Sequence, residues 1–301
     1  MSDSAAIDCQ DLTKRYKGTD TDALHRLNIK VSRGEVYGYL GPNGAGKSTT
    51  IRLLMNFIQP TGGTAKIGGL DIVKDSVAIK RHVGYLAGDV ALYPKTTGRE
   101  LLDYLYDLQG GNDRPYRQKL ERRFEAQLDQ PIRSLSKGNR QKIGILQAFM
   151  HRPEVLILDE PTSGLDPLMQ EAFYETVREA RSDGVAILMS SHNLAEAQRV
   201  CDRAGIIKHG KLIHEQSVSG DSDLGRQVFR VTLAGHGDIA KLKKTPGLKF
   251  LSMEGGTIAL VQADGPLREA LGALSKFDIR DFSTQQLNLE DEFIEFYGAE
   301  K

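Results

Sequence analysis

Continuous apolar runs are the first pattern along this chain. The runs Val36–Leu40, Val155–Leu158 and Val185–Met189 carry no charged side chain. Strands of a parallel sheet are buried on both faces and show this pattern. We therefore predict three central strands. Because ligands bind at the carboxyl ends of such strands, the residues that follow each run are candidates for a functional site.

Alternating and helical patterns occupy the rest of the first two thirds. Ile7–Leu12 and Leu24–Val31 alternate between apolar and polar residues, which predicts antiparallel strands. Shorter strands are predicted at 65–67, 83–86, 204–208 and 211–214. Apolar residues at helical spacing predict helices at 48–57, 77–81, 99–108, 116–128, 140–150, 168–181 and 195–201.

The pattern starts again after residue 226. Residues 216–226 are rich in Ser, Gly and Asp and predict a linker between a domain at 1–215 and a second domain at 227–301. The second domain has the predicted order βαββαβ, which is typical of a small ferredoxin-like α+β sheet. A last amphipathic helix is predicted at Leu289–Tyr297.

The residues after the first apolar run match a phosphate-binding loop. The pattern G-x-x-x-x-G-K-[S/T] is matched by Gly41, Pro42, Asn43, Gly44, Ala45, Gly46, Lys47, Ser48 and Thr49. Such glycines let successive backbone N–H groups face one phosphate. Lys47 can reach the β- and γ-phosphates, and the Ser48 hydroxyl can bind Mg²⁺. A glycine-rich turn without a ligand is the alternative, and the flanking strand and helix argue against it.

Acidic and imidazole side chains follow the other two runs. Asp159 and Glu160 close the second run, and His192 follows the third. Asp159 fits a water-mediated contact with Mg²⁺, and Glu160 fits a general base or water-orienting group. His192 repeats this strand-end position and could face the γ-phosphate. Each could instead be an ordinary loop residue, but a phosphate loop upstream favours function.

Two further candidates carry a weaker signal. Tyr16 ends the first predicted strand, and its ring could stack on a bound base or be a half-buried edge residue. The polar turn Leu135–Asn139 opens a predicted helix. Its Ser and Gly could form an anion site at the helix start or simply cap the helix.

Composition narrows the class of protein. A length of 301 residues suggests about two domains. Lys+Arg and Asp+Glu balance at 40 each, which argues against a general nucleic-acid-binding surface. The two cysteines lie in unrelated contexts, so a reduced cytosolic compartment is expected. No signal peptide or apolar run of about 20 residues is visible, so any membrane span would come from another chain.

Together these segments resemble the ATP-binding subunit of ABC transporters over about Ile7–His214. Gly41–Thr49 is similar to the Walker A loop and Val155–Glu160 to the Walker B strand. Leu135–Asn139 looks like the signature turn, Ser163–Asp166 like the D-loop and His192 like the switch histidine. The resemblance implies an α/β P-loop NTPase fold: a mixed sheet, an antiparallel β-subdomain and a helical insertion at about 90–150.

The resemblance also implies ligands and a mechanism. ATP and Mg²⁺ are the expected cofactors, with Tyr16 stacked on adenine and Lys47, Glu160 and His192 in catalysis. A second copy of the chain is expected to supply Ser136, Gly138 and Asp166 to the nucleotide, so a homodimer would enclose two ATP. Hydrolysis would reopen the dimer and drive a membrane partner.

The signature turn and the segment Leu289–Phe293 resemble the drug- and bacitracin-resistance exporters. Those pair with a separate ABC-2-type membrane subunit, so a cytoplasmic protein on the inner face of the membrane is expected. The family's contact surface for that subunit corresponds to residues 89–100. We predict a shallow apolar groove there around Leu92, Tyr93 and Leu101.

Two positions depart from the family pattern. Gly88 stands where the family usually has Gln, or Glu in this subgroup, and it has no ligand atom. Asp89 follows and is a candidate metal ligand in its place. Asn139 stands where Gln is common, which keeps an amide on a shorter side chain.

Two rival functions stay open from the sequence. A soluble ABC protein acting on ribosomes or DNA usually carries two cassettes in one chain or long coiled-coil arms, and neither pattern is present. An ATP-dependent switch could bind nucleotide without turnover. Phosphate release separates this second rival from an exporter ATPase, while the transported substrate cannot be read from this chain.

Overall fold

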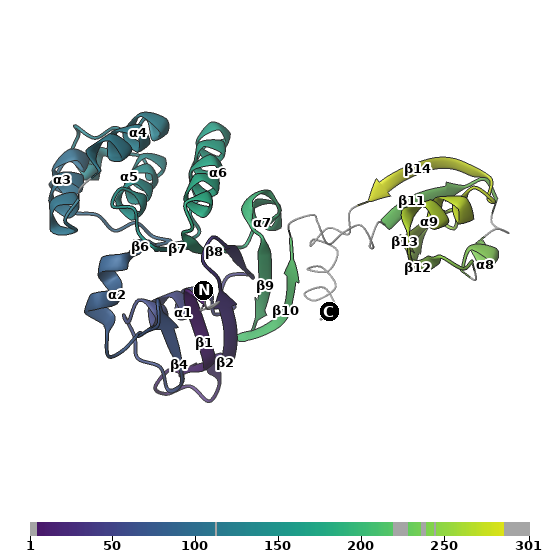
Figure 1. Cartoon of the computed structure of the whole chain (residues 1–301), viewed down its shortest axis with the longest axis horizontal. Helices are drawn as coiled ribbons and strands as arrows, with labels where there is room; N and C mark the ends of the chain where they lie inside the picture. Colours follow the sequence, from purple (N-terminus) through teal and green to yellow (C-terminus); the bar gives the residue numbers. More distant parts are fainter. Residues whose placement is uncertain (1–4, 112, 219–227, 236–238, 244, 286–301) are drawn as a thin grey trace. The chain divides into compact units, whose positions relative to one another are not determined.

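The computed structural model describes residues 5–111, 113–218, 228–235, 239–243 and 245–285. The chain divides into two compact units, Met1–Val218 and Ser219–Lys301 (Figure 1). The predicted helix Leu289–Tyr297 and the predicted linker from residue 219 lie outside the described residues. No helix of the described segments is long and apolar enough to cross a bilayer.

An antiparallel sheet forms one side of the first unit. Its strands are β1 (Ile7–Arg15), β2 (Asp22–Val31), β4 (Gly62–Ile67) and β5 (Leu70–Asp71), in the order β2-β1-β4-β5. β1 pairs Ile7 with Val31 of β2 and with Ile67 of β4. These alternating apolar side chains are buried in the core, which confirms the predicted antiparallel subdomain.

The central sheet has six strands and carries the residues predicted to be functional at one edge. Its order is β10-β9-β3-β8-β7-β6, and its strands are β3 (Val36–Leu40), β6 (Val83–Leu86), β7 (Val155–Asp159), β8 (Ala186–Ser191), β9 (Arg203–Lys208) and β10 (Lys211–Ser217). Pairing is parallel from β9 to β6, and β10 is the antiparallel edge. Every residue of β3, β7 and β8 is buried, as their continuous apolar pattern predicts.

Outside the helical insertion, five helices connect strands of the first unit, and side-chain caps fix where some of them begin. They are α1 (Lys47–Leu54), α2 (Ser76–His82), α5 (Lys137–Phe149), α6 (Pro167–Ser182) and α7 (Leu194–Val200). The Ser136 hydroxyl accepts from the Asn139 N–H at 3.2 Å and starts α5. Asp166 accepts from the Met169 N–H at 3.0 Å and starts α6. Such caps satisfy backbone donors that the helix itself leaves free.

The helical insertion contains α3 (Gly98–Leu108) and α4 (Arg114–Phe124). Figure 1 shows both helices grouped with α5 and α6, away from β1, β2 and β4. Arg123 of α4 donates to Glu179 of α6 at 2.7 Å. The predicted continuation of α4 to residue 128 is wrong: Glu125 adopts a left-handed backbone with φ 47°, which ends the helix.

The predicted apolar groove is wrong in one of its three residues. Leu101 is only 5% exposed because it lies on the inner face of α3. Tyr93 is 67% exposed and Leu92 is half-buried. Helical periodicity identifies the apolar face of α3, but that face packs into the insertion and is not free for a partner.

In the described part of the second unit, an antiparallel sheet is accompanied by two helices. Its strands are β11 (Val228–Leu233), β12 (Leu248–Glu254), β13 (Ile258–Ala263) and β14 (Ile279–Gln285), in the order β12-β13-β11-β14. α8 (Ile239–Leu242) and α9 (Leu267–Leu274) complete the order βαββαβ. Phe229, Val231 and Leu274 belong to its separate core. This is the ferredoxin-like arrangement that the sequence predicts.

Candidate functional site

The phosphate loop closes around the side chain of its own lysine. Lys47 is only 6% exposed, and its ammonium donates to the carbonyls of Gly41 at 2.5 Å and Pro42 at 3.3 Å. Gly46 precedes it with φ 115°, and a Cβ there would lie 2.9 Å from the Ala23 carbonyl oxygen. Only glycine fits that backbone and that space. The loop thus holds the Lys47 ammonium beside the start of α1. The positive charge and the helix start both favour a bound anion there.

Asp159 lies across the cleft from the loop's serine. Its Oδ2 accepts from the Ser48 hydroxyl at 3.0 Å. Asp159 is 7% exposed, and none of the ion pairs between described residues involves it. Burying a carboxylate without a cation is costly. The geometry is therefore suited to a cation beside Ser48 and Asp159.

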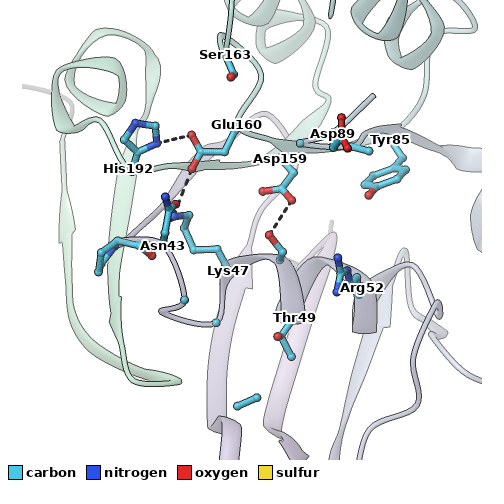
Figure 2. A pocket seen from close by; sticks show the side chains of 17 residues that line it. Asn43, Lys47, Thr49, Arg52, Tyr85, Asp89, Asp159, Glu160, Ser163 and His192 are labelled. Atoms are coloured by element: carbon cyan, nitrogen blue, oxygen red, sulfur yellow. Dashed lines mark hydrogen bonds and ion pairs between the residues drawn. The ribbon is translucent and has the colours of Figure 1, made fainter. Parts of the chain in front are cut away.

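Glu160 connects the phosphate loop to the loop after β8. One carboxylate oxygen lies 2.6 Å from His192 Nδ1, and the other lies 3.3 Å from Lys47 Nζ. Figure 2 shows the three side chains pointing toward one another. Glu160 also has φ 48°, a left-handed conformation that costs a non-glycine residue about 1 kcal/mol or more. Strain of this kind is concentrated at functional sites.

A cleft of about 570 Å³ opens above these residues. Its volume is in the range of small-molecule sites. Most of the predicted site residues line it: Pro42, Asn43, Gly44, Gly46, Lys47, Ser48, Thr49, Asp89, Asp159, Glu160 and His192. Residues from β3, β7 and β8 meet here because these strands end at one edge of the sheet.

Three predicted residues lie beside the cleft without lining it. Tyr16 is partly exposed, with its hydroxyl 3.5 Å from Thr49 Oγ1 at the rim. Gly41 lies beneath the loop, where a Cβ would be 2.6 Å from a backbone carbonyl oxygen. Ala45 is buried, and its carbonyl accepts from the Gly210 N–H at 2.8 Å. The backbone of Gly41 and Ala45 shapes the loop, and Tyr16 leaves an aromatic face near its mouth.

Ser136, Gly138 and Asp166 are not among the described residues that line the cleft. The first turn of α5 instead packs on the loop before α6. A Cβ on Gly138 would lie 2.6 Å from the Gly164 carbonyl oxygen, and Lys137 donates to Ser163 at 3.0 Å. Ser136 and Asp166 are exposed, so these predicted nucleotide contacts lie at the surface and outside the lining of the cleft.

The side-chain amide of Asn139 makes two hydrogen bonds to the backbone of Gln127. Its Oδ1 accepts from the Gln127 N–H at 2.9 Å, and its Nδ2 donates to the Gln127 carbonyl at 3.0 Å. The side chain thus pins residue 127, which lies in the segment that follows α4. The Asn139 side chain therefore binds the backbone of Gln127 within this chain.

The Gly88 loop packs directly against Asp159. A Cβ on Gly88 would lie 3.3 Å from Asp159 Cγ and Oδ2, so the backbone approaches the carboxylate closely. Asp89 lines the cleft on the wall that carries Tyr85, as Figure 2 shows. At the position where the family has Gln or Glu, the backbone of Gly88 therefore lies against Asp159. The carboxylate of Asp89 follows one residue later.

The donor set fits Mg²⁺. Ser48, Asp159 and Asp89 offer only oxygen atoms, and Mg²⁺ prefers oxygen ligands and keeps several of its waters. No cluster of three or more His, Cys, Asp or Glu side chains suited to a metal occurs within the described part of the chain. A site with one or two carboxylates near a phosphate loop is typical of Mg²⁺ bound together with a nucleotide.

Five residues that line the cleft were not assigned to the site from the sequence: Ala23, Arg52, Tyr85, Ala87 and Ser163, the last of which was named only as part of the D-loop. Arg52 is four residues after Ser48, so helical spacing on α1 could have identified it. Tyr85 lies on β6, and burial raises its pKa, with a smaller contribution from the negative charge of Asp159. No sequence pattern marks Tyr85, because its place beside Asp159 follows from the pairing of β6 with β7.

Comparison with known protein families and relatives agrees with this geometry. The model of the ABC transporter family matches residues 24–163. The chain is 32% identical over 313 residues to the daunorubicin/doxorubicin resistance ATP-binding protein DrrA of Streptomyces peucetius, across 97% of this chain and 92% of that one. It is 36% identical over 212 residues to the probable multidrug ABC transporter ATP-binding protein YbhF of Escherichia coli (strain K12). That match covers 69% of this chain but only 36% of YbhF.

Solved structures share the fold of the first unit. A structure of an ATP-binding subunit of an ABC transporter has a TM-score of 0.66 and 32% identity, across 71% of this chain and 90% of that one. The dimeric structure of MJ0796, a bacterial ABC transporter cassette, has a TM-score of 0.65 and 23% identity, across 71% and 99% of the two chains. Because the identity to MJ0796 is only 23%, this similarity supports the fold alone.

Proposed function

Because this chain belongs to the ABC transporter family as an ATP-binding cassette, we propose that it binds and hydrolyses ATP to drive a separate exporter permease. The observation that carries the proposal is the position of Glu160. Its carboxylate bridges Lys47 and His192 at the mouth of the phosphate loop. A carboxylate at this position can accept the proton of a water that attacks the γ-phosphate.

The chemistry follows from an exchange of partners at Lys47. A γ-phosphate in the loop offers Lys47 a stronger counter-charge than Glu160 does, so the carboxylate is released toward the attacking water. Water attacks phosphorus while the bond to the β-phosphate oxygen breaks, giving ADP and phosphate. Glu160 orients this water and accepts its proton, and His192 keeps the carboxylate in place.

Ser48, Asp159 and Asp89 would hold Mg²⁺. The ion neutralises charge that develops on the phosphate oxygens when it is bound. Within the chain itself, Ser48 and Asp159 are already hydrogen-bonded, so the two ligands need little rearrangement. Tyr16 at the rim would stack on the adenine ring.

A second copy of this chain would complete each nucleotide site. Ser136, Gly138 and Asp166 lie on a surface outside the cleft, so in one chain they do not meet the phosphates. In a two-fold dimer each copy offers this surface to the other. The dimeric cassette MJ0796 supports this proposal by its fold. The unit from Ser219 would stabilise or regulate the dimer.

The membrane partner is proposed from the relatives. DrrA is named as a daunorubicin/doxorubicin resistance protein, which supports an ABC-2-type exporter permease as the partner of this chain. The exposed Tyr93 and the half-buried Leu92 would contribute to the permease contact. The cassette would then act from the cytoplasm at the inner face of the membrane.

Phosphate release by the purified chain with Mg²⁺ and ATP tests the proposal. Glu160→Gln is expected to lower turnover by about 100-fold or more while ATP still binds. The variant should trap an ATP-bound dimer that elutes as twice the monomer mass. Glu154→Gln, at the opposite end of β7, is the matched control and should turn over ATP like the wild type. Unchanged turnover in Glu160→Gln would contradict the assignment. A wild type that binds ATP without releasing phosphate would favour a switch.

A further inference from the structure

Ser190 is a buried hydroxyl that the nucleotide chemistry above does not use. It lies near the carboxyl end of β8, between the strands that carry the phosphate loop and the two acids. In the register of the sheet it is paired with Tyr39 of β3 and with Asp159 of β7. Its exposed fraction is zero. A polar side chain at such a place needs hydrogen-bond partners within the protein.

Those partners are the two acidic residues of the site. The Ser190 hydroxyl donates to Asp159 Oδ1 at 2.5 Å. The same oxygen accepts from the backbone N–H of Glu160 at 3.1 Å. A hydroxyl has one proton to donate and lone pairs to accept with, so one side chain serves both contacts at once. Ser190 thereby ties together Asp159 and Glu160.

The contact fixes which oxygen of Asp159 faces the cleft. Ser190 takes up Oδ1 from the sheet side, and Ser48 donates to Oδ2 from the loop side. Rotation of the carboxylate would break both bonds in a buried place, where an unmade hydrogen bond costs about 1–3 kcal/mol. Oδ2 is therefore held toward Ser48, the other oxygen donor of the proposed metal site.

The contact at Glu160 supports a strained backbone. Glu160 has φ 48°, and its N–H is held by both the carbonyl and the hydroxyl of Ser190, at 3.2 and 3.1 Å. A left-handed conformation of a non-glycine residue persists only where its surroundings stabilise it. Hydrogen bonds to β8 thus hold the backbone of Glu160 in place, and this backbone positions the carboxylate.

We propose that Ser190 is a positioning residue that presents Asp159 Oδ2 to the divalent cation and sets the backbone of Glu160. The proposal rests on the proposed function, since it assigns the cleft to a nucleotide with Mg²⁺. Ser190 acts on the cation through Asp159, as residues behind metal ligands do when they orient them. The alternative is a buried serine that only satisfies the fold.

The chain offers a matched control in the next residue. Ser191 is also buried, and its hydroxyl donates to the buried carboxylate of Glu196 at 2.6 Å. Ser190→Ala and Ser191→Ala therefore each remove a hydroxyl–carboxylate bond from the end of the same strand. Only the first of these bonds involves Asp159. A purely structural role predicts similar effects of the two changes on cation binding.

Mn²⁺ binding to the full chain with ADP tests the proposal, with free Mn²⁺ measured by electron paramagnetic resonance. Ser190→Ala is expected to weaken Mn²⁺ binding by about 10-fold or more, the usual effect of losing a residue behind a metal ligand. ADP affinity without metal should stay at the wild-type value. Ser191→Ala should bind Mn²⁺ like the wild type.

Ser190→Thr and Ser190→Val provide a second pair if the alanine variant loosens the core. The two have nearly the same shape and differ in the hydroxyl, so Thr should keep Mn²⁺ affinity and Val should lose it. Equal Mn²⁺ affinity of Thr and Val, or of Ser190→Ala and wild type, would overturn the role of Ser190 alone. A wild-type chain that binds neither ADP nor Mn²⁺ would overturn the proposed function as well.

Discussion

The two ends of the central strands use their charges differently. At the amino ends, acidic residues are paired with arginines of the same chain. Arg203 lies 2.7 Å from Glu35 before β3, Arg33 lies 2.7 Å from Glu154 before β7, and Arg181 pairs with Asp202 before β9. Each of these acidic residues thus has a cation partner within the chain, and the Arg203–Glu35 pair joins the starts of the neighbouring strands β9 and β3.

At the carboxyl ends, the charges converge on a shared space. Lys47, Asp159, Glu160 and His192 line one cleft, and Asp159 has no cation partner within the described ranges. The acidic residues of the amino ends have arginine partners, and Glu160 has Lys47 and His192, whereas Asp159 faces the cleft without a cation partner among the described residues. A charged side chain therefore marks a candidate ligand site here by its lack of a partner, and not by its charge alone.

The largest expected effect comes from the carboxyl edge. Lys47→Ala should weaken ATP binding by about 100-fold or more, because the phosphates lose the buried ammonium that is held by the loop carbonyls. The free energy of unfolding without ligand should change far less. Titration with a fluorescent ATP analogue and urea unfolding measure the two quantities.

Arg33→Met is the amino-edge control for this variant. Arg33 pairs with Glu154 on the surface, so its loss should leave ATP affinity at the wild-type value. Near-normal affinity of Lys47→Ala would refute the phosphate loop, and a loss in Arg33→Met would refute the division between the two edges.

An intermediate effect is expected from the best-connected pair of the amino edge. Arg203 donates to Glu35 at 2.7 Å, to the Lys30 carbonyl at 3.0 Å and to Glu215 at 3.1 Å. Arg203→Met leaves Glu35 largely buried without its cation, so we expect a loss of about 2 kcal/mol in unfolding free energy. Urea unfolding measures this loss, and ATP affinity should stay unchanged.

The exposed pair again serves for comparison. Arg33→Met should lower the unfolding free energy by less than about 1 kcal/mol, because exposed ion pairs contribute little. If Arg203→Met were as stable as Arg33→Met, or if it weakened ATP binding, the pairs at this edge would have a role other than holding the strands.

The smallest expected effect is on the unfolding free energy at low pH, through the ion pair that joins α4 to α6. A hydrogen bond from Arg123, assisted by Lys119, lowers the pKa of Glu179 from 4.5 to about 2. A depressed carboxyl pKa stabilises the fold above pH 4.5, and this contribution is lost as the pH falls toward 2. Because Glu179 is 41% exposed, solvent screening limits the contribution to about 1 kcal/mol or less.

Glu179→Gln checks this sign. Its unfolding free energy should fall below that of the wild type at neutral pH, and the difference should shrink between pH 4.5 and about 2. Unfolding at a series of pH values measures the difference. A difference that stays constant over this range would mean that the pair does not titrate with folding.

Local patterns were enough to find most of the site. The phosphate loop from Gly41 to Thr49 is identified by spacing, and the acids after Val155–Leu158 by an apolar run that is typical of a strand buried on both faces. Asn139 and Gly88 are visible as departures, but their consequences are not. The structure shows that Asn139 binds Gln127 and that Gly88 brings backbone against Asp159.

Other features depend on contacts that no local pattern encodes. Leu101 looks like a surface position for a partner, yet it is buried because α3 packs against its neighbours. α4 ends at Phe124 because Glu125 turns left-handed, although apolar spacing continues to Leu128. Tyr85 and Arg52 enter the cleft only through strand pairing and helix orientation.

Apolar periodicity and glycine spacing act within a few residues of chain, so they were enough to predict most elements, the phosphate loop, and the acids and histidine of the site. The placing of the ends of β3, β8 and β7 side by side depends on the order of the strands in the folded sheet. The tertiary structure also decided that Ser190 joins Asp159 to Glu160. Pairing between distant strands is chosen by burial of both sheet faces, a property of the whole core and not of any one segment.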